Sequence, residues 1–215
     1  MNFQGFSADD FDTFMIPELD DRMTAIKQLI RPKFEFIGTH FVPSLTTLTG
    51  NEMFFHVAKH ARRTKNPPND TWVAFSSNAR GYKMLPHFQV GLWGSHLFII
   101  FAVIYEYPYK ENLGIILEEQ YRELKKQIPN NFVWSTDHTK PTATAQENLA
   151  DEQILHMFNR LQTIKKAEIL CGVHIDKDDV INMNDKQLLN IIDTTFKTLM
   201  PLYELATSSS TVLSK

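Results

Sequence analysis

The sequence is poor in cysteine and has no long hydrophobic run. Its 215 residues include a single cysteine, Cys171, which has no partner for a disulfide within the chain and therefore favours a reducing compartment. The longest apolar run, residues 97–105, is half of what a membrane-spanning helix requires. The first residues have neither the basic nor the apolar segment of a secretory signal. We therefore expect a cytoplasmic protein that does not associate with membranes.

The sequence also lacks the short motifs that identify common catalytic and cofactor sites. The patterns G-x-G-x-x-G, C-x-x-C, G-x-S-x-G and G-x-x-x-x-G-K-[ST] are all absent. The sequence therefore does not identify a cofactor, which stays unknown, and it leaves open whether the protein is an enzyme. The formal net charge of −3 argues against a protein whose main role is to coat nucleic acid, because such binding depends mostly on neutralising phosphates.

Acidic residues are nearly missing from one stretch, residues 53–105, which we call the central stretch. It holds one of the 25 acidic residues, Asp70, but six of the 22 basic residues: Lys59, Arg62, Arg63, Lys65, Arg80 and Lys83. It also holds four of the eight histidines. Like charges this close together repel, so they need water, carboxylates from other segments or an anionic ligand. The sequence leaves three explanations open: pairing with carboxylates, binding of an anion, and a basic surface that binds nothing.

The ligand hypothesis gives these residues a role as a cationic pocket for a small phosphate- or carboxylate-bearing molecule. Arginine contacts such anions with two parallel hydrogen bonds, and the turn at Gly81 brings backbone N–H groups close to an anion. The expected ligand-binding residues are Arg62, Arg63, Arg80 and Lys83, with His60 and His87 at the edge. Two alternatives remain: a nucleic-acid-binding module that uses a basic sheet face, and a non-enzymatic module that docks an acidic protein. The oligomeric state is not indicated.

Other chemically active residues give weaker signals. His56 and His60 have the spacing of a helical metal pair, but Val57 replaces the glutamate of H-E-x-x-H, so no metal site is expected. The neighbours Asp137 and His138 suggest a general base, with His87 or His174 joining it. Cys171 reads as a buried small hydrophobic residue, and the three tryptophans read as core residues rather than stacking platforms.

Apolar residues recur at helical spacing in four regions. Residues 19–30 form one amphipathic face, Pro32 should kink or break the helix, and the pattern resumes from Phe34 to the stop at Thr49-Gly50. Further helices are expected at residues 110–128, at residues 151–163, and from a capping box at Asn184 to a bend at Pro201.

Strand signals dominate the middle of the chain. Strands are expected at residues 72–76, 88–93, 97–105, 132–135 and 167–175, and an exposed loop at residues 136–148. Residues 53–63 suit either a helix or a strand, and we favour a strand because the segments after them are strand-like. Gly94-Ser95 suits a type II′ hairpin, and the apolar strand after it should lie at the centre of the sheet. The order predicts an α+β fold with helices packed on a mostly antiparallel sheet. We expect one domain, residues 6–206, and a disordered tail, residues 207–215.

A similarity between residues 68–73 (PNDTWV) and 129–134 (PNNFVW) suggests an internal duplication of a helix–strand unit. Several longer motifs carry a resemblance to a known family: residues 56–75 (HVAKHARRTKNPPNDTWVAF), 80–83 (RGYK), 85–89 (LPHFQ), 132–135 (FVWS) and 137–141 (DHTKP). With these motifs the chain, from about Phe6 to Leu205, resembles the YktB-like family of Gram-positive bacteria. The resemblance implies a bacterial cytoplasmic α+β protein. It implies no activity and assigns no site residues.

Overall fold

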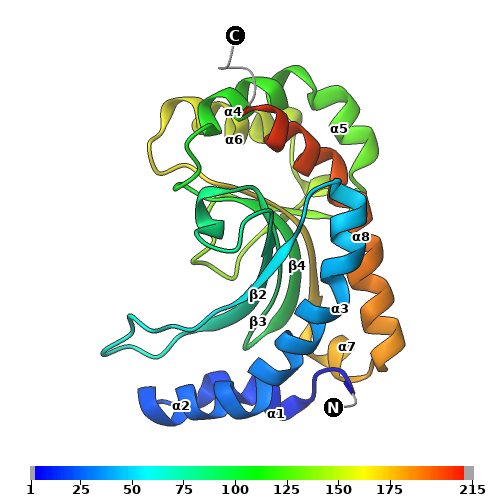
Figure 1. Cartoon of the computed structure of the whole chain (residues 1–215). Helices are drawn as coiled ribbons and strands as arrows, with labels where there is room; N and C mark the ends of the chain where they lie inside the picture. The colour runs from blue at the N-terminus through cyan, green and yellow to red at the C-terminus, as the bar shows by residue number, and fades with distance from the viewer. Residues whose placement is uncertain (1–2, 211–215) are drawn as a thin grey trace.

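A computed structural model describes residues 3–210 (Figure 1). Its sheet has seven strands in the order β1-β2-β3-β4-β7-β5-β6, and each pair of neighbours is antiparallel. The strands are β1 (Phe54–Val57), β2 (Asp70–Ser76), β3 (His87–Trp93), β4 (His96–Val103), β5 (Val133–Ser135), β6 (Thr144–Ala145) and β7 (Ile169–Asp176). The helices are α1 (Ala8–Asp12), α2 (Leu19–Ala25), α3 (Arg31–Thr49), α4 (Lys110–Glu119), α5 (Tyr121–Gln127), α6 (Asp151–Thr163), α7 (Lys177–Ile181) and α8 (Asp185–Ser208). The expected α+β class is confirmed.

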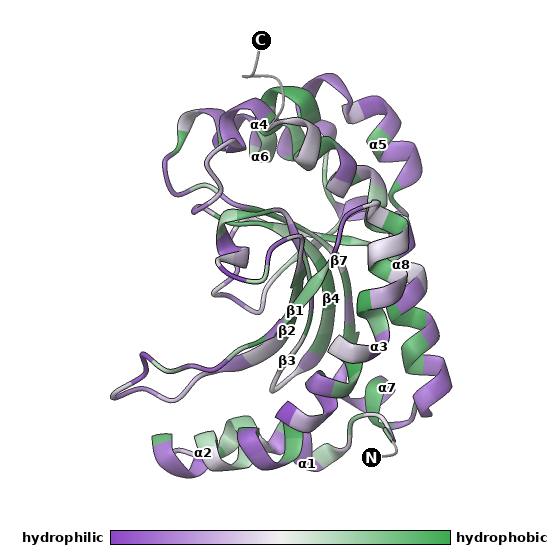
Figure 2. Cartoon of the chain, in the orientation of Figure 1, coloured by the Kyte–Doolittle hydropathy of each residue, from purple (hydrophilic) through white to green (hydrophobic). Residues whose placement is uncertain are grey.

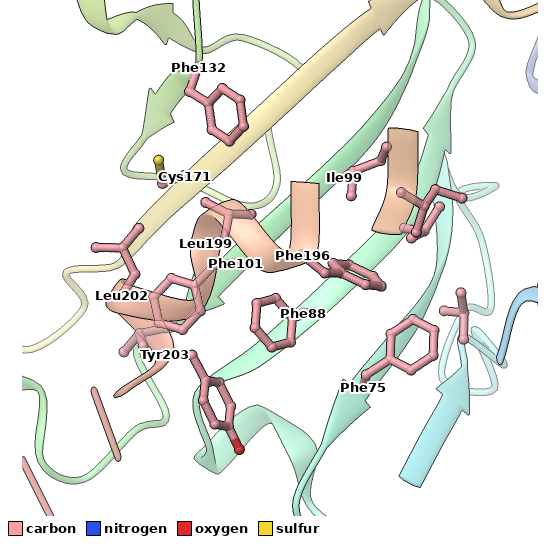
Figure 3. Close-up of a cluster of buried hydrophobic side chains, with 14 of the residues drawn as sticks. Phe75, Phe88, Ile99, Phe101, Phe132, Cys171, Phe196, Leu199, Leu202 and Tyr203 are labelled. Carbon is pink, nitrogen blue, oxygen red and sulfur yellow. The ribbon is translucent and has the colours of Figure 1, made fainter. Parts of the chain in front are cut away.

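α3 and α8 cover one face of the sheet, which we call the helix face (Figures 1 and 2). Strand alternation directs every second side chain toward this face, where the largest hydrophobic cluster lies. Phe196 of α8 sits in the middle of it, with its ring centroid 5.5 Å from that of Phe75 and 5.1 Å from that of Phe88 (Figure 3). Cys171 is buried on the same face, as expected. This layer fixes the curvature of the strands on which the functional residues lie.

The other side of the sheet, which we call the open face, has no long helix against it in Figure 1. It carries the alternate strand residues, among them Trp72, Gln89, Phe98 and His174. A second, smaller hydrophobic cluster lies here around Trp93 and Phe98. The open face is therefore where polar and aromatic side chains of the strands can meet a ligand.

β4 lies at the centre of the sheet and all of its residues are buried, as its apolar composition predicts. β3 and β4 form the expected hairpin, with Leu92 opposite Leu97. The expected type II′ turn is wrong, because it requires a positive φ that Gly94 does not have. A Cβ atom at Gly94 would lie 3.3 Å from the Phe14 Cβ. The glycine is therefore explained by the close approach of the N-terminal segment.

The prolines do not end the long N-terminal helix as expected. The chain stays helical from Leu19 to Thr49, with a π-helical segment, Ile26–Ile30, directly before Pro32. Pro32 lies in the first turn of α3, where the missing N–H of proline is tolerated. Pro43 lies inside α3, which ends at the expected place, where Gly50 is left-handed with φ of 67°.

Three other boundaries differ from expectation. The strand expected over residues 53–63 stops at Val57, and the chain continues into an irregular hairpin arm. The helix expected over residues 110–128 is divided at Gln120, although its predicted apolar stripe is buried. The loop expected over residues 136–148 contains β6 and the buried Gln146, whose side chain bonds Trp134 Nε1 and the Ile128 carbonyl. A two-residue strand is too short to leave a periodic signal.

Some expectations concern the chain as a whole. α8 continues through Thr207 to Ser208, and the Ser209 side chain is buried against the Tyr107 hydroxyl, so the expected tail cannot begin at residue 207. Residues 211–215 lie outside the described part, and their disorder stays a prediction. The two similar segments, residues 68–73 and 129–134, lead into β2 and β5. The internal duplication stays a prediction, and so does the single domain over residues 6–206. Among the described helices, none has both the length and the apolar character to cross a membrane.

Candidate functional site

A cleft of about 1280 Å³ lies beside β1 and the segment that follows it. Its walls come from the first half of α3, from β1 and β2, from the turn at Tyr82–Met84 (η3), and from residues 138–139. Residues 58–69, which we call the arm, form one end and extend away from the sheet in Figure 1. The base of the arm is held by Arg22 of α2, whose Nη1 donates to the Pro68 carbonyl at 2.8 Å. The cleft thus joins segments that are far apart in the sequence.

Five of the six expected ligand-binding residues line this cleft: His60, Arg62, Arg63, Arg80 and Lys83. The three arginines are exposed, whereas His60 and Lys83 are half-buried. One cation that the sequence gave no reason to select, Arg31, joins them from α3. Its position depends on the packing of α3 against β1, which no local pattern shows.

His87 does not line the cleft. It is fully buried, its Nδ1 donates to the Leu85 carbonyl at 2.7 Å, and its Nε2 accepts from the Gln89 amide at 2.8 Å. Burial lowers the pKa of His87 to about 4, so the imidazole is neutral at pH 7. The expectation that His87 contacts the ligand at the pocket edge is therefore corrected. Tyr82 covers it, with a ring-centroid distance of 5.1 Å.

The cations of the cleft form no direct ion pair within the described residues. Within residues 3–210, no carboxylate oxygen lies within 4.0 Å of the side-chain nitrogens of the six cleft cations: Arg31, Lys59, Arg62, Arg63, Arg80 and Lys83. The acidic residues of the lining are Glu35, Asp70 and Glu106. Of the three explanations that the sequence left open, direct ion pairing is excluded by this geometry for the described residues; a solvated basic surface and an anion site both fit it.

His60 lines the cleft together with the cations Arg31, Arg63 and Lys83. Its Nε2 lies 3.1 Å from the Thr71 hydroxyl, its ring meets the Trp72 ring edge-on at 5.6 Å, and its φ of 50° is rare outside glycine. Burial, followed by the charges of Arg63, Arg31 and Lys83, lowers its pKa to about 4. A neutral imidazole therefore lies among three permanent cations.

Asp70 is the acidic counterpart at the start of β2. Burial raises its pKa to about 6, although His138, Arg63 and Lys83 act in the opposite direction. Arg63 and Lys83 thus contribute to the pKa shifts of both half-buried titratable groups, His60 and Asp70. Both cations line the same cleft.

Aromatic side chains form the floor of the cleft. The Tyr82 ring stacks on the His56 ring at 5.2 Å, and the Tyr82 hydroxyl accepts a hydrogen bond from Trp72 Nε1 at 3.0 Å. Burial raises the pKa of Tyr82 to about 12, so the hydroxyl stays protonated. Trp93 and Trp134 are buried core residues, as expected, whereas Trp72 is only half-buried. Trp72 and Trp93 also line the cleft. The cleft combines cations with flat apolar walls.

The Asp137–His138 pair expected from the sequence does not form. The Asp137 carboxylate accepts hydrogen bonds from the Thr139 backbone and hydroxyl. His138 Nδ1 instead lies 2.8 Å from Oε2 of Glu168, a buried residue directly before β7. Sequence reasoning missed Glu168, because thirty residues and a helix separate it from His138.

The described residues contain no group of three or more His, Cys, Asp or Glu side chains placed to hold a metal ion. The two histidines with metal-like spacing have other partners: His56 Nε2 lies 3.0 Å from the Asn78 carbonyl, and His60 Nε2 contacts Thr71. The cleft presents cations and histidine nitrogens together with the carboxyl groups of Glu35, Asp70 and Glu106.

Comparison with known proteins supports the family resemblance. Residues 6–203 match a family model described as "Domain of unknown function (DUF1054)". A UPF0637 protein of Bacillus velezensis is 55% identical over 200 residues, which cover 93% of this chain and 95% of that protein. A UPF0637 protein of Bacillus cereus is 51% identical over 205 residues, covering 95% and 99%, and one of Bacillus licheniformis is 48% identical over 200 residues, covering 93% and 95%. The chain therefore belongs to the family defined by the DUF1054 domain, which occurs in these Bacillus proteins.

Proposed function

We propose that the protein binds a small anionic ligand, bearing a phosphate or carboxylate group, in the cleft beside the arm. Arg63 and Lys83 bind the anion, Arg62 and Arg80 contribute from the walls, and His60 lies at the edge as a neutral hydrogen-bonding group. His87 supports the floor through Tyr82. The proposal keeps the cytoplasmic location expected from the sequence, for which the unpaired Cys171 is the support.

The observation that carries the proposal is the set of six cleft cations without an ion-pair partner in the described chain. Two unit charges 4 Å apart repel by about 4 kcal/mol at an effective dielectric constant of 20, so keeping cations together costs free energy. An anion that sits between Arg63 and Lys83 removes this cost. Arginine adds a bidentate geometry that matches phosphate and carboxylate oxygens.

A thermal-shift screen of inorganic phosphate, pyrophosphate, nucleotides, sugar phosphates and dicarboxylates tests the proposal. A ligand at 100 times its dissociation constant adds about 2.7 kcal/mol to the free energy of unfolding. For a protein of this size that corresponds to a rise in Tm of several degrees, on the order of 5–10 °C. We expect at least one compound to give such a shift, and Arg63→Ala and Lys83→Ala to abolish it.

Lys65→Ala is the matched control, because Lys65 is an exposed cation of the same arm that does not line the cleft. It should leave the shift intact. Equal losses in Lys65→Ala and Arg63→Ala would indicate a diffuse basic surface and contradict the pocket. Tight binding of an oligonucleotide that weakens steeply between 50 and 200 mM salt, with no small-ligand shift, would favour the nucleic-acid alternative.

A further inference from the structure

His138 occupies a position that no other histidine of the chain shares. It lines the large cleft and also a small neighbouring cavity of about 30 Å³ on the open face, bounded by Gln89, Trp93 and His174. Its side chain is 20% exposed, whereas that of its partner Glu168 is 5% exposed. A nearly buried carboxylate therefore holds an imidazole that remains accessible from the cleft.

The hydrogen bonds of this pair fix the orientation of the imidazole ring. Glu168 Oε2 accepts from the His138 backbone N–H at 3.0 Å, and its two oxygens lie 2.9 and 2.8 Å from His138 Nδ1. A carboxylate only accepts, so Nδ1 carries the hydrogen. In the neutral ring Nε2 then keeps its lone pair, and within residues 3–210 it makes no hydrogen bond. Nε2 is the atom available to a ligand.

The surroundings of His138 supply the other parts of a reaction site. Asp70 and His87 lie within its electrostatic reach, and the Tyr105 ring lies 6.4 Å from its ring. Arg63 and Lys83 line the same cleft as His138. An accessible imidazole and cations that share one cleft are parts that general-base catalysis on an anionic substrate uses.

We propose that the cleft hydrolyses a phosphate ester, with His138 as the catalytic general base and Glu168 as the residue that positions it. This rests on the proposed anion binding, since Arg63 and Lys83 must hold the phosphate. Trp72 and Trp93 line the same cleft, so the alcohol part of the ester is expected to carry a flat ring.

The step balances with water as the only co-reactant. Nε2 of His138 takes a proton from water while the water oxygen forms a bond to phosphorus. The bond between phosphorus and the ester oxygen breaks on the opposite side of the phosphorus, where the leaving oxygen takes a proton from a second water, while the imidazolium gives its proton to the hydroxide that remains. The products are an alcohol and a phosphate with one ester bond fewer, and neutral His138 is restored. Arg63 and Lys83 offset the negative charge that develops on the phosphate oxygens.

The experiment measures hydrolysis of 4-nitrophenyl phosphate and bis(4-nitrophenyl) phosphate by the full chain, both of which carry a flat ring. General-base catalysis contributes about 10²- to 10⁴-fold, so His138→Gln should lower kcat by at least about 100-fold while the KM changes little. His156→Gln, which removes an exposed histidine of α6, should leave kcat unchanged. Arg63→Ala should raise the KM.

The variant Glu168→Gln tests whether Glu168 positions the His138 ring or only supports the fold. An amide no longer stabilises the imidazolium, so the acidic limb of the pH profile of kcat/KM should move to lower pH while the Tm stays high enough for assay. The ¹⁵N chemical shifts of His138 should show the Nδ1–H tautomer in the original protein and a mixture of tautomers in Glu168→Gln. If Glu168 only supported the fold, its replacement would change neither the pH profile of kcat/KM nor the tautomer of His138.

The outcomes distinguish the two proposals. A ligand that shifts the Tm through Arg63 and Lys83, with no hydrolysis or with full hydrolysis by His138→Gln, overturns the catalytic proposal and leaves anion binding standing. His138 in the Nε2–H tautomer, or charged throughout the active pH range, also overturns it. Hydrolysis that depends on His138 and moves its pH profile with Glu168 supports it. Absence of any anion binding overturns both.

Discussion

His87 illustrates how a single residue can be identified as chemically important and yet be given the wrong role. The sequence placed it with the cations because it lies in the central stretch, but its nitrogens bond Leu85 and Gln89 inside the fold. Arg63 and Lys83 were identified correctly as cleft residues, because an excess of charge is visible in local composition. Arg31 and Glu168 were missed, because each reaches the site through packing between distant segments.

The neutral, buried histidines predict a pH dependence of stability. The pKa values of His60 and His87 are lowered to about 4 and that of His174 to about 3, mainly by burial, from an ordinary value of 6.5. Below pH 6.5 the unfolded chain binds protons that the folded chain does not bind. Each such histidine therefore removes up to about 1.4 kcal/mol of stability per pH unit as the pH falls from 6.5 toward 4. Asp70, with a raised pKa of about 6, opposes this trend between pH 6 and 3.8.

His87→Asn tests this dependence, because the amide of Asn can still donate to the Leu85 carbonyl. Urea unfolding at pH 7.0 and 5.0 should show a smaller loss of unfolding free energy in the variant than in the original protein, by about the contribution of one proton. His156→Asn controls for the loss of an imidazole as such. A loss on acidification that is identical in His87→Asn and the original protein would show that His87 does not contribute.

At the scale of elements, periodic patterns predicted well and single breaking residues predicted poorly. The apolar stripe of residues 113–128 is buried as expected, because a stripe averages over several turns. Pro32 did not break its helix, because it lies in the first turn of α3, where the missing N–H of proline is tolerated. The strand expected over residues 53–63 ended early: after Val57 one backbone bond, from the Ala58 N–H to the Trp72 carbonyl, continues the contact with β2, and the Arg22 side chain holds the arm at the Pro68 carbonyl.

The start of α8 gives a quantitative prediction at this scale. The capping box expected there is present: Asn184 Oδ1 accepts from the Gln187 backbone N–H at 2.9 Å, and Gln187 Oε1 accepts from the Asn184 backbone N–H at 3.0 Å. Asn184→Ala should lower the free energy of unfolding by about 1 kcal/mol, and Asn184→Asp should largely restore it. Chemical denaturation measures the difference. A change below about 0.3 kcal/mol would mean that the cap is not needed once α8 packs on the sheet.

At the scale of the whole molecule, the structure shows where the excess of positive charge lies. The acid-poor central stretch folds so that five of its six cations, joined by Arg31, border one cleft, whereas the ion pairs that the structure records involve other segments, such as Lys125 with Asp151 and Lys197 with Asp193. Composition could reveal the excess of positive charge. It could not reveal whether the charges converge, because that depends on the path of the arm and on the packing of α3.

The most direct test of anion binding in the cleft is a crystal structure of the protein grown or soaked with pyrophosphate. The account predicts that the anion lies between the Arg63 guanidinium and the Lys83 ammonium group, next to His60, with Arg63 and Lys83 free of carboxylate partners. Pyrophosphate bound only at other lysines, or Arg63 and Lys83 each paired with an aspartate or glutamate in the crystal, would contradict it.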